Sequence, residues 1–250
     1  MSKHVGRCRL CGSYTTLTYE HIPPKKAFNK NYQKFETLND LLGISGRKYS
    51  IFRQGIGLNT LCARCNHSTG GWYGAAFVKW TKQGYRWLEI LEKETVFALP
   101  FYVMPLNVIK QICVMTLSMS RESALDYHDE LRRFVLNKES RYIPSKYKVF
   151  VYFNRTGQPR FGSEAVVFKV GENRFDFVEA EITLPPFGYC ITSTRSQKNS
   201  SLAEHQGLHD ITWFSRYDYN DWTQIYLSLP FLQTTHPLPL YYGASHETLA

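Results

Sequence analysis

The sequence has no apolar run that approaches the roughly 18 residues needed to span a membrane, which argues against a membrane-embedded protein. It also has no repeat and no low-complexity tract. Residues 1–7 show neither the charged start nor the apolar stretch of a secretory leader. We therefore expect a soluble, cytoplasmic protein of one large or two small domains, with no membrane partner.

Acidic residues are scarce in one part of the chain. Residues 1–94 hold 15 lysines and arginines against 6 acidic residues, whereas residues 95–250 hold 15 of each, so the net charge of +9 belongs to the first part. This concentration of positive charge predicts a polyanionic partner, nucleic acid, whose binding depends strongly on salt. The alternative is an ordinary solvated surface, which the asymmetry between the two parts makes less attractive. The candidate contacts are Lys25, Lys26, Arg47, Lys48, Arg53 and Arg64.

Cysteine is also sparse, but four of the six cysteines form two Cys-x-x-Cys pairs, Cys8/Cys11 and Cys62/Cys65. Disulfides are one interpretation, although thiols inside cells usually stay reduced. A redox Cys-x-x-Cys is another, but that motif normally occurs singly at the start of a helix. Two matched pairs favour a closed, tetrahedral Zn²⁺ site of the structural type. Buried core positions are expected for the other two thiols, Cys113 and Cys190.

The segment around these pairs carries side chains suited to chemistry. Glu20 and His21 are neighbours just before Pro23-Pro24, and Asn66 follows Cys65 directly. Phosphodiester hydrolysis needs a base for the attacking water and a positive charge near the leaving oxygen. A neutral imidazole, with an unperturbed pKa of about 6.5, suits the first task, and hard carboxylate and amide oxygens suit Mg²⁺ or Mn²⁺ for the second. The alternative is that Glu20 caps an element and His21 is a surface histidine.

Three segments, taken together, resemble a known family. They are Cys8–Cys11, Thr18–Lys25 and Leu61–Asn66. Through them, residues 8–74 look like the HNH (ββα-metal) endonuclease superfamily, in the subgroup that carries two zinc knuckles around the active-site hairpin. The resemblance covers about the first third of the chain.

The resemblance implies a role for individual residues. In that family an acidic residue or a histidine just before the key histidine binds a divalent cation, the key histidine acts as general base, and a residue on the following helix is a second ligand. Carried over to this sequence, Glu20 and Asn66 hold a catalytic Mg²⁺ or Mn²⁺ and His21 is the base. The four paired cysteines then hold the structural zinc.

The pattern departs from the usual family form at two places. The middle asparagine, which pins the hairpin loop, has a candidate in Asn59, although this residue lies only three positions before Cys62. A further ligand is expected one helical turn after Asn66, where the sequence has Gly70, which cannot ligate. His67 is the alternative ligand, but adjacent positions on a helix do not share a face.

Hydrophobic periodicity predicts an α+β fold. Residues 72–94 have apolar residues at helical spacing, and residues 103–137 predict two helices, of which the first is apolar on nearly all sides and therefore buried. The second, from about Ser120, is amphipathic. From about Lys146 the period changes to two, which predicts an antiparallel sheet or a small barrel. Residues 25–60 form an insertion for which we expect a short helix and a basic loop.

We therefore expect a zinc-bound ββα-metal nuclease domain over residues 1–94, followed over residues 95–250 by a helical middle and an antiparallel β-rich domain without an assigned role. The expected function is endonuclease cleavage of DNA rather than RNA. The alternative is a zinc-stabilised nucleic-acid-binding or adaptor module that has lost cutting, an idea that Gly70 encourages. By analogy with the family's nucleases in bacterial defence systems and mobile elements, the C-terminal part is expected to restrain or target the enzyme through a protein partner or an oligomer.

Overall fold

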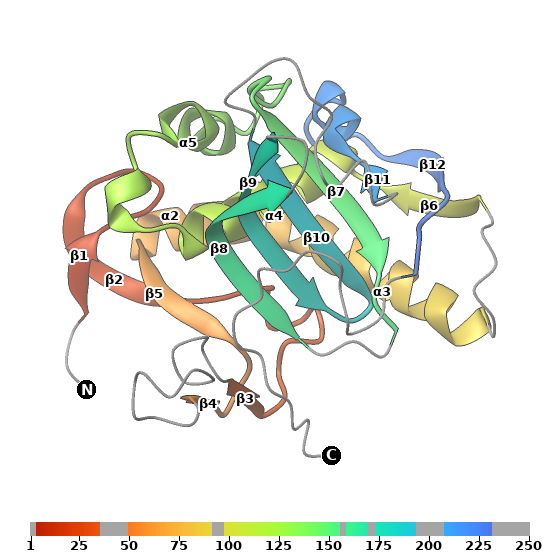
Figure 1. Ribbon diagram of the computed structural model, residues 1–250, viewed down its shortest axis with the longest axis horizontal. Coiled ribbons are helices and arrows are strands. Elements are labelled where there is room, and N and C mark those ends of the chain that lie inside the picture. The colour runs from red at the N-terminus through yellow and green to blue at the C-terminus, as the bar shows by residue number, and fades with distance from the viewer. Residues whose placement is uncertain are drawn as a thin grey trace.

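A five-stranded antiparallel sheet with a buried helix packed beside it forms the centre of the computed structural model (Figure 1). The structure describes residues 4–35, 50–91, 98–155, 159–169, 174–193 and 208–231. Within these ranges the fold is mixed α+β, as expected. Its elements in chain order are β1 (Val5–Arg7), β2 (Tyr14–His21), β3 (Gln33–Phe35), β4 (Ser50–Phe52), β5 (Gly57–Cys62), α2 (Ala63–Thr69), η1 (Gly70–Gly74), α3 (Ala75–Ile90), β6 (Leu99–Val103), α4 (Pro105–Met119), η2 (Glu122–Ala124), α5 (Asp129–Leu136), β7 (Tyr147–Phe153), β8 (Arg160–Lys169), β9 (Arg174–Leu184), β10 (Phe187–Ser193), β11 (His209–Asp210), η3 (Thr212–Arg216) and β12 (Thr223–Leu227).

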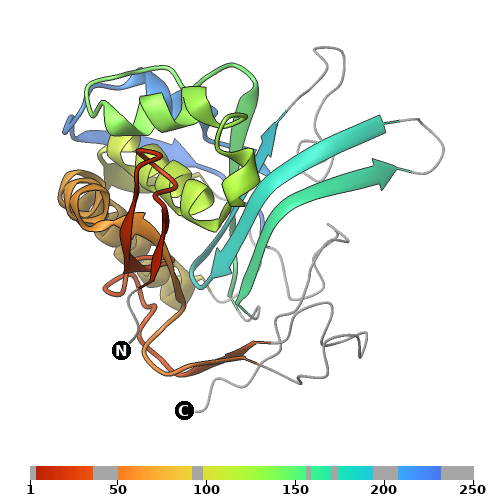
Figure 2. The same cartoon turned by 90° about the vertical axis from the view of Figure 1, so that its left-hand side faces the viewer.

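The large sheet confirms the change of period that begins near Lys146. Its strand order is β11-β7-β10-β9-β8, and every neighbouring pair is antiparallel. The middle strands β7 and β10 are buried along almost their whole length, which explains their nearly continuous apolar sequences. Figure 2 shows that β8 and β9 form a long hairpin that extends away from the helices.

Helix α4 lies in the core, as its apolar sequence predicts. Pro105 takes the first helical position, where its missing N–H costs nothing, and every residue except Met119 is buried. The helix contacts η1, α3, α5 and strands β5, β8 and β9. Its buried Lys110 donates hydrogen bonds to the carbonyls of Asn137 at 2.5 Å and Lys138 at 3.1 Å, so a positive charge meets the C-terminal end of α5.

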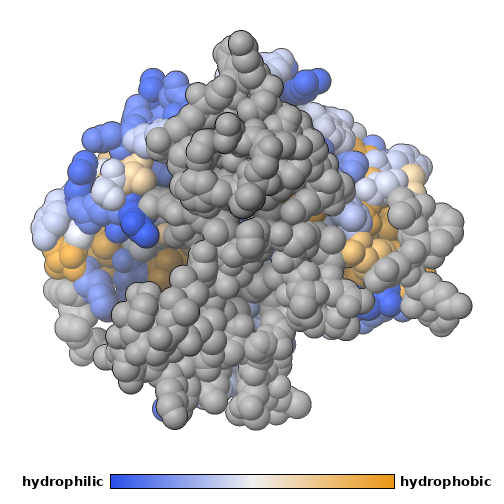
Figure 3. All heavy atoms as spheres, in the orientation of Figure 1, coloured by the Kyte–Doolittle hydropathy of each residue, from blue (hydrophilic) through white to orange (hydrophobic). Residues whose placement is uncertain are grey.

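The second helix expected in residues 103–137 begins later than predicted. Ser120 has an extended backbone and ends α4, and η2 separates it from α5, which starts at Asp129. Just before this start, His128 is buried and its Nδ1 lies 2.9 Å from the hydroxyl of Tyr147 on β7, which holds the chain in a non-helical turn. The outer face of α5 is hydrophilic, as expected for an amphipathic helix (Figure 3).

The N-terminal part builds a strand–strand–helix unit. Strands β1, β2 and β5 form a three-stranded sheet in that order, in which β2 and β5 pair antiparallel with His21 opposite Gly57 and Leu17 opposite Cys62. Helix α2 begins at the next residue, and α2, η1 and α3 continue without an intervening loop to Ile90. The helix expected over residues 72–94 is present but starts earlier, because the turn that carries Cys65 is already helical.

The hydrophobic core is continuous across the expected domain boundary. Trp80 of α3 stacks on Phe187 of β10 with ring centroids 4.6 Å apart, and its Nε1 donates to the Tyr189 hydroxyl at 2.9 Å. The buried cluster runs from Cys8 to Leu229. The division into residues 1–94 and 95–250 stays a prediction, and these contacts join its two parts tightly.

Two sequence expectations fall on residues that the structure leaves undescribed. The short helix expected near Leu38–Ile44 lies outside the described ranges, as does the basic loop tip with Arg47 and Lys48. The strands on either side of it, β3 and β4, pair antiparallel. In the described ranges, none of the helices combines the length and the apolar character that crossing a membrane requires.

Candidate functional site

The four paired cysteines come together at one end of the strand–strand–helix unit. Their Sγ atoms all lie within 4.8 Å of one another. A tetrahedral zinc site with Zn–S bonds of about 2.3 Å has sulfur atoms about 3.8 Å apart, and the Sγ atoms of Cys11 and Cys62 are 3.8 Å apart. The cluster can therefore bind a structural metal such as zinc.

The backbone around the cluster is arranged to support negative sulfur. The N–H of Cys62 donates to Cys8 Sγ at 3.3 Å, and the N–H of Cys65, in the first turn of α2, donates to Cys62 Sγ at 3.5 Å. A hydrogen bond from the Cys65 thiol, followed by backbone N–H groups, lowers the pKa of Cys8 to about 4 against the opposing effect of burial. The same hydrogen bond raises the pKa of Cys65. These hydrogen bonds favour a thiolate at Cys8.

The other two cysteines are buried core thiols, as expected. Cys113 and Cys190 are both fully buried. Burial raises the pKa of Cys113 to about 12, so this thiol stays protonated and unreactive.

A cleft of about 590 Å³ lies beside the cluster, where β2 ends and the helical segment begins. A second cavity of about 650 Å³ borders α5, but its lining has only one carboxylate and one guanidinium, Glu130 and Arg133, and no histidine or cysteine. The chemistry of the lining therefore selects the cleft at β2. Its lining residues are Tyr19, Glu20, His21, Pro24, Lys25, Lys26, Asn66, Gly70, Gly74, Ala75, Val78, Lys79, Lys82 and Gln111.

Glu20 is a buried residue of this cleft's lining. Its side chain is 8% exposed, and no described residue donates a hydrogen bond to its carboxyl group. Burial raises the pKa of Glu20 to about 7. A buried carboxylate of this kind needs a proton or a cation to offset the lost hydration.

His21 is fixed with one nitrogen left for chemistry. Its Nε2 lies 3.1 Å from the carbonyl oxygen of Gln54, which can only accept a hydrogen bond, so Nε2 carries the proton and Nδ1 is an acceptor. The ring packs edge-on against Tyr19 with centroids 5.0 Å apart. Burial and the charge of Lys25 lower the pKa of His21, while the Gln54 carbonyl raises it. The net result is an imidazole that is neutral near pH 7.

Asn66 faces the same cleft from the first turns of α2. Its Nδ2 donates to Thr18 Oγ1 at 3.0 Å and to the carbonyl of Tyr19 at 3.1 Å, both on β2. These two bonds fix the amide, and no described residue donates to Oδ1. The amide nitrogen of Asn66 is therefore held against β2.

Of the remaining candidate residues, some line the cleft and others lie outside it. Lys25 and Lys26 line the cleft, whereas the exposed Arg53 and Arg64 do not. His67 is exposed on α2 and also lies outside the cleft lining, while Gly70 lines the cleft.

An unpredicted residue, Asn29, pins the loop after β2. It is 1% exposed, its Nδ2 donates to the carbonyls of Pro23 at 2.6 Å and Ile56 at 2.7 Å, and its Oδ1 accepts the N–H of Ile56 at 2.7 Å. Asn59, the residue considered for a loop-pinning role, is a strand residue of β5 paired with Tyr19. The contacts observed across this loop come from Asn29. The sequence signal was an asparagine soon after Pro23-Pro24.

Three more lining residues were missed. Lys79 and Lys82 lie one turn apart on α3, and Gln111 comes from α4. The spacing of the two lysines on the expected helix was a usable signal, whereas Gln111 lies in a helix whose sequence resembles core. Together with Lys25 and Lys26, the two lysines of α3 give the cleft four ammonium groups against one carboxylate.

No protein-family model, curated protein or solved structure matches the chain. The resemblance to HNH endonucleases therefore depends on the three motif segments alone.

Proposed function

We propose that this chain is a metal-dependent endonuclease of the HNH (ββα-metal) type that hydrolyses phosphodiester bonds in DNA. One observation carries the proposal. The β2–β5–α2 unit brings Glu20, His21 and Asn66 into a single cleft that is lined by lysines. A carboxylate, a neutral imidazole and an amide oxygen among positive charges are the groups that phosphodiester hydrolysis requires.

The cysteine cluster is assigned to a structural Zn²⁺. All four ligands are sulfur, three of the four are buried, and a closed four-thiolate site leaves no position for a substrate. The metal would join the turn after β1 to the junction of β5 and α2. Because Asn66 follows Cys65 directly, this connection sets where Asn66 meets the cleft.

The catalytic cation is assigned to Glu20 and Asn66, whose oxygen atoms fit Mg²⁺ or Mn²⁺. When bound, such an ion supplies positive charge to the scissile phosphate and to the leaving oxygen. His21 Nδ1 takes a proton from the water whose oxygen attacks phosphorus, while the opposite P–O bond breaks. The Gln54 carbonyl then stabilises the imidazolium that forms, because it accepts the hydrogen bond of Nε2. The lysines hold the flanking phosphates.

Plasmid cleavage tests the proposal. Supercoiled DNA is incubated at low salt with the full-length, zinc-loaded protein and Mg²⁺, Mn²⁺ or no added cation. We expect nicking or linearisation only with the cations, and a rate lower by about 10²–10⁴-fold in His21→Ala. His67→Ala is the matched control, since His67 is exposed outside the cleft, and it should cut like the wild type.

The alternative function, a binding module that no longer cuts, predicts a different result. Gly70 stands where the family has a further ligand, which favours this alternative. A folded, zinc-loaded wild type that binds DNA in a salt-sensitive manner and never cuts it with either cation would replace the nuclease proposal by the binding module.

A further inference from the structure

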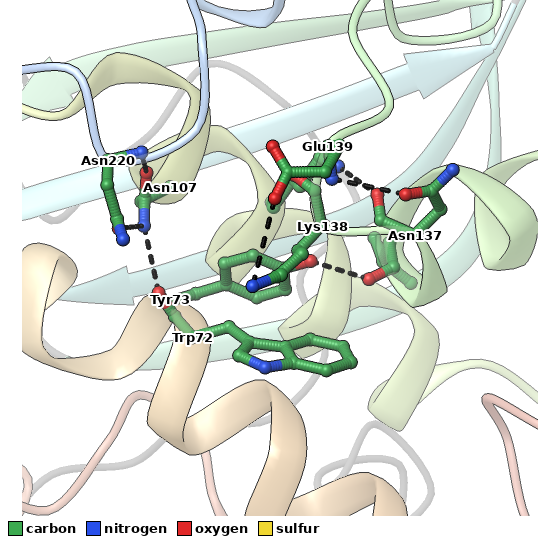
Figure 4. Close-up of polar contacts among 9 residues, drawn as sticks. Trp72, Tyr73, Asn107, Asn137, Lys138, Glu139 and Asn220 are labelled. Atoms are coloured by element: carbon green, nitrogen blue, oxygen red, sulfur yellow. Dashed lines mark hydrogen bonds and ion pairs between the residues drawn. The ribbon is translucent and has the colours of Figure 1, made fainter.

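Two buried amides, Asn107 and Gln111, lie one turn apart on α4 and so share a face of that helix. Asn107 shows where this face points. Its Nδ2 donates to the carbonyl of Trp72 at 2.8 Å, within η1 (Figure 4). Asn107 is fully partnered, because Nδ2 also donates to Asn220 Oδ1 at 2.9 Å and Oδ1 accepts the Asn220 N–H at 3.0 Å.

Gln111, in contrast to Asn107, has an amide oxygen without a described hydrogen-bond partner. Its side chain is 1% exposed, and its Oε1 is buried without a hydrogen-bond donor among the described residues. A buried acceptor in this state carries an uncompensated desolvation cost. Gln111 nevertheless lines the cleft that holds Glu20 and Asn66. Gln111 therefore brings an amide group with an unsatisfied oxygen to the wall of this cleft.

Two glycines of η1, Gly70 and Gly74, line the same cleft as Gln111. Both have ordinary right-handed helical dihedrals, with φ of −60°. A Cβ at either position would meet no atom within 4 Å. Neither backbone conformation nor close packing requires glycine here, so what these residues provide is room in the cleft.

We propose that Gln111 supplies a third protein oxygen, Oε1, to the divalent cation held by Glu20 and Asn66. It takes the role that Gly70 cannot fill, from a helix outside the strand–strand–helix unit. An amide oxygen is a hard ligand of the kind that Mg²⁺ and Mn²⁺ accept. The inference rests on the proposed function, because it requires the cation at Glu20.

Mn²⁺ binding to the full-length, zinc-loaded protein tests this role without any nucleic acid. Bound Mn²⁺ is measured by electron paramagnetic resonance and calorimetry. We expect Gln111→Leu to weaken Mn²⁺ binding by about tenfold or more, Gln111→Glu to preserve or tighten it, and Glu20→Ala to abolish it. Thr116→Val is the matched control, because Thr116 is another buried polar residue of α4, bonded to the Ile112 carbonyl at 3.0 Å and absent from the cleft lining. It should leave Mn²⁺ affinity unchanged.

Thermal unfolding separates ligation from a structural role. Gln111→Leu should melt at the same temperature as the wild type or higher, since it removes an unsatisfied acceptor. A lower melting temperature, or unchanged Mn²⁺ affinity in Gln111→Leu together with a Glu20-dependent site in the wild type, overturns the role of Gln111 and leaves the proposed nuclease intact. A wild type without any Glu20-dependent Mn²⁺ site overturns both.

Discussion

The cysteine cluster and the lysine-lined cleft are neighbours on the same strand–strand–helix unit, yet they differ in how many of their polar atoms are hydrogen-bonded within the protein. In the cluster, sulfur atoms accept hydrogen bonds from the backbone and from one another. In the cleft, the Glu20 carboxyl group, Asn66 Oδ1 and Gln111 Oε1 receive no hydrogen bond from any described residue. The first arrangement stabilises the fold, and the second leaves binding capacity for a ligand. Substitutions in the two places should therefore separate stability from activity.

The largest effect is expected in the cluster, from Cys62→Ser. Loss of one thiolate should release the metal and lower the free energy of unfolding by more than about 3 kcal/mol, because structural zinc contributes on the order of 10 kcal/mol of binding free energy in small domains. Zinc content and urea unfolding measure this. Cys113→Ala is the control, and it should keep its zinc. A Cys62→Ser protein with full zinc and unchanged stability would remove the distinction between the two regions.

Asn29→Ala tests the loop that connects them. The change leaves the Ile56 N–H and the Pro23 carbonyl buried without the partner that Asn29 provides, which should cost about 2–4 kcal/mol. The Ile56 carbonyl still accepts the N–H of Ile22 at 2.9 Å. Cleavage should fall as well, since the loop begins beside His21. Urea unfolding and plasmid cleavage measure the two effects. Asn59→Ala, at a half-buried strand position, is expected to change stability by less than about 1 kcal/mol. Equal losses in the two variants would return the pinning role to Asn59.

The lysines of α3 should matter more for affinity than for folding, where the contribution expected is the contact of Lys79 Nζ with the Trp222 ring, 4.5 Å from its centroid. The double variant Lys79→Ala/Lys82→Ala is expected to bind DNA about tenfold more weakly and to reduce the slope of log affinity against log salt by about 2, one unit for each lost phosphate contact. Fluorescence anisotropy over a salt series measures both. Arg86→Ala, on the same helix but outside the cleft lining, should leave the slope unchanged. A slope that changes equally in both variants would mean that the charge acts over the whole surface.

The smallest effect is expected for Gly70→Ala. This change should also separate stability from activity most sharply, because the two should move in opposite directions. Alanine should raise the free energy of unfolding by about 0.5–1 kcal/mol, because glycine loses more conformational entropy in a helix and a Cβ meets no atom here. Cleavage should nevertheless decrease, since Gly70 lines the cleft and the added methyl group takes up space there. Gly71→Ala has the same open surroundings outside the cleft lining and should gain stability without losing activity. Full activity in Gly70→Ala would show that the space is not used.

Local patterns explain why the cluster and part of the cleft were predictable. Each motif can be recognised from a few neighbouring residues: the two Cys-x-x-Cys pairs, the Glu-His step and the asparagine beside the last cysteine. Period-two alternation of apolar residues predicted the large sheet. Asn29 could not be assigned, because its partners at Pro23 and Ile56 meet only after the loop has folded. Gln111 was even harder to predict from the sequence. Its helix is apolar on nearly all sides, and an amide within such a sequence is read as core.

The passage of α4 beneath η1 also has a consequence for the order in which the chain is made. Residues 1–94 leave the ribosome first and contain both cysteine pairs, Glu20, His21 and Asn66. Gln111 follows later, and α4 reaches its place only once its partners in the core, including strands β8 and β9, have been synthesised. A nascent or truncated chain would accordingly hold zinc while its cleft still lacked one wall. On the proposed function, synthesis itself would then delay cleavage until α4 and the strands that it contacts are in place.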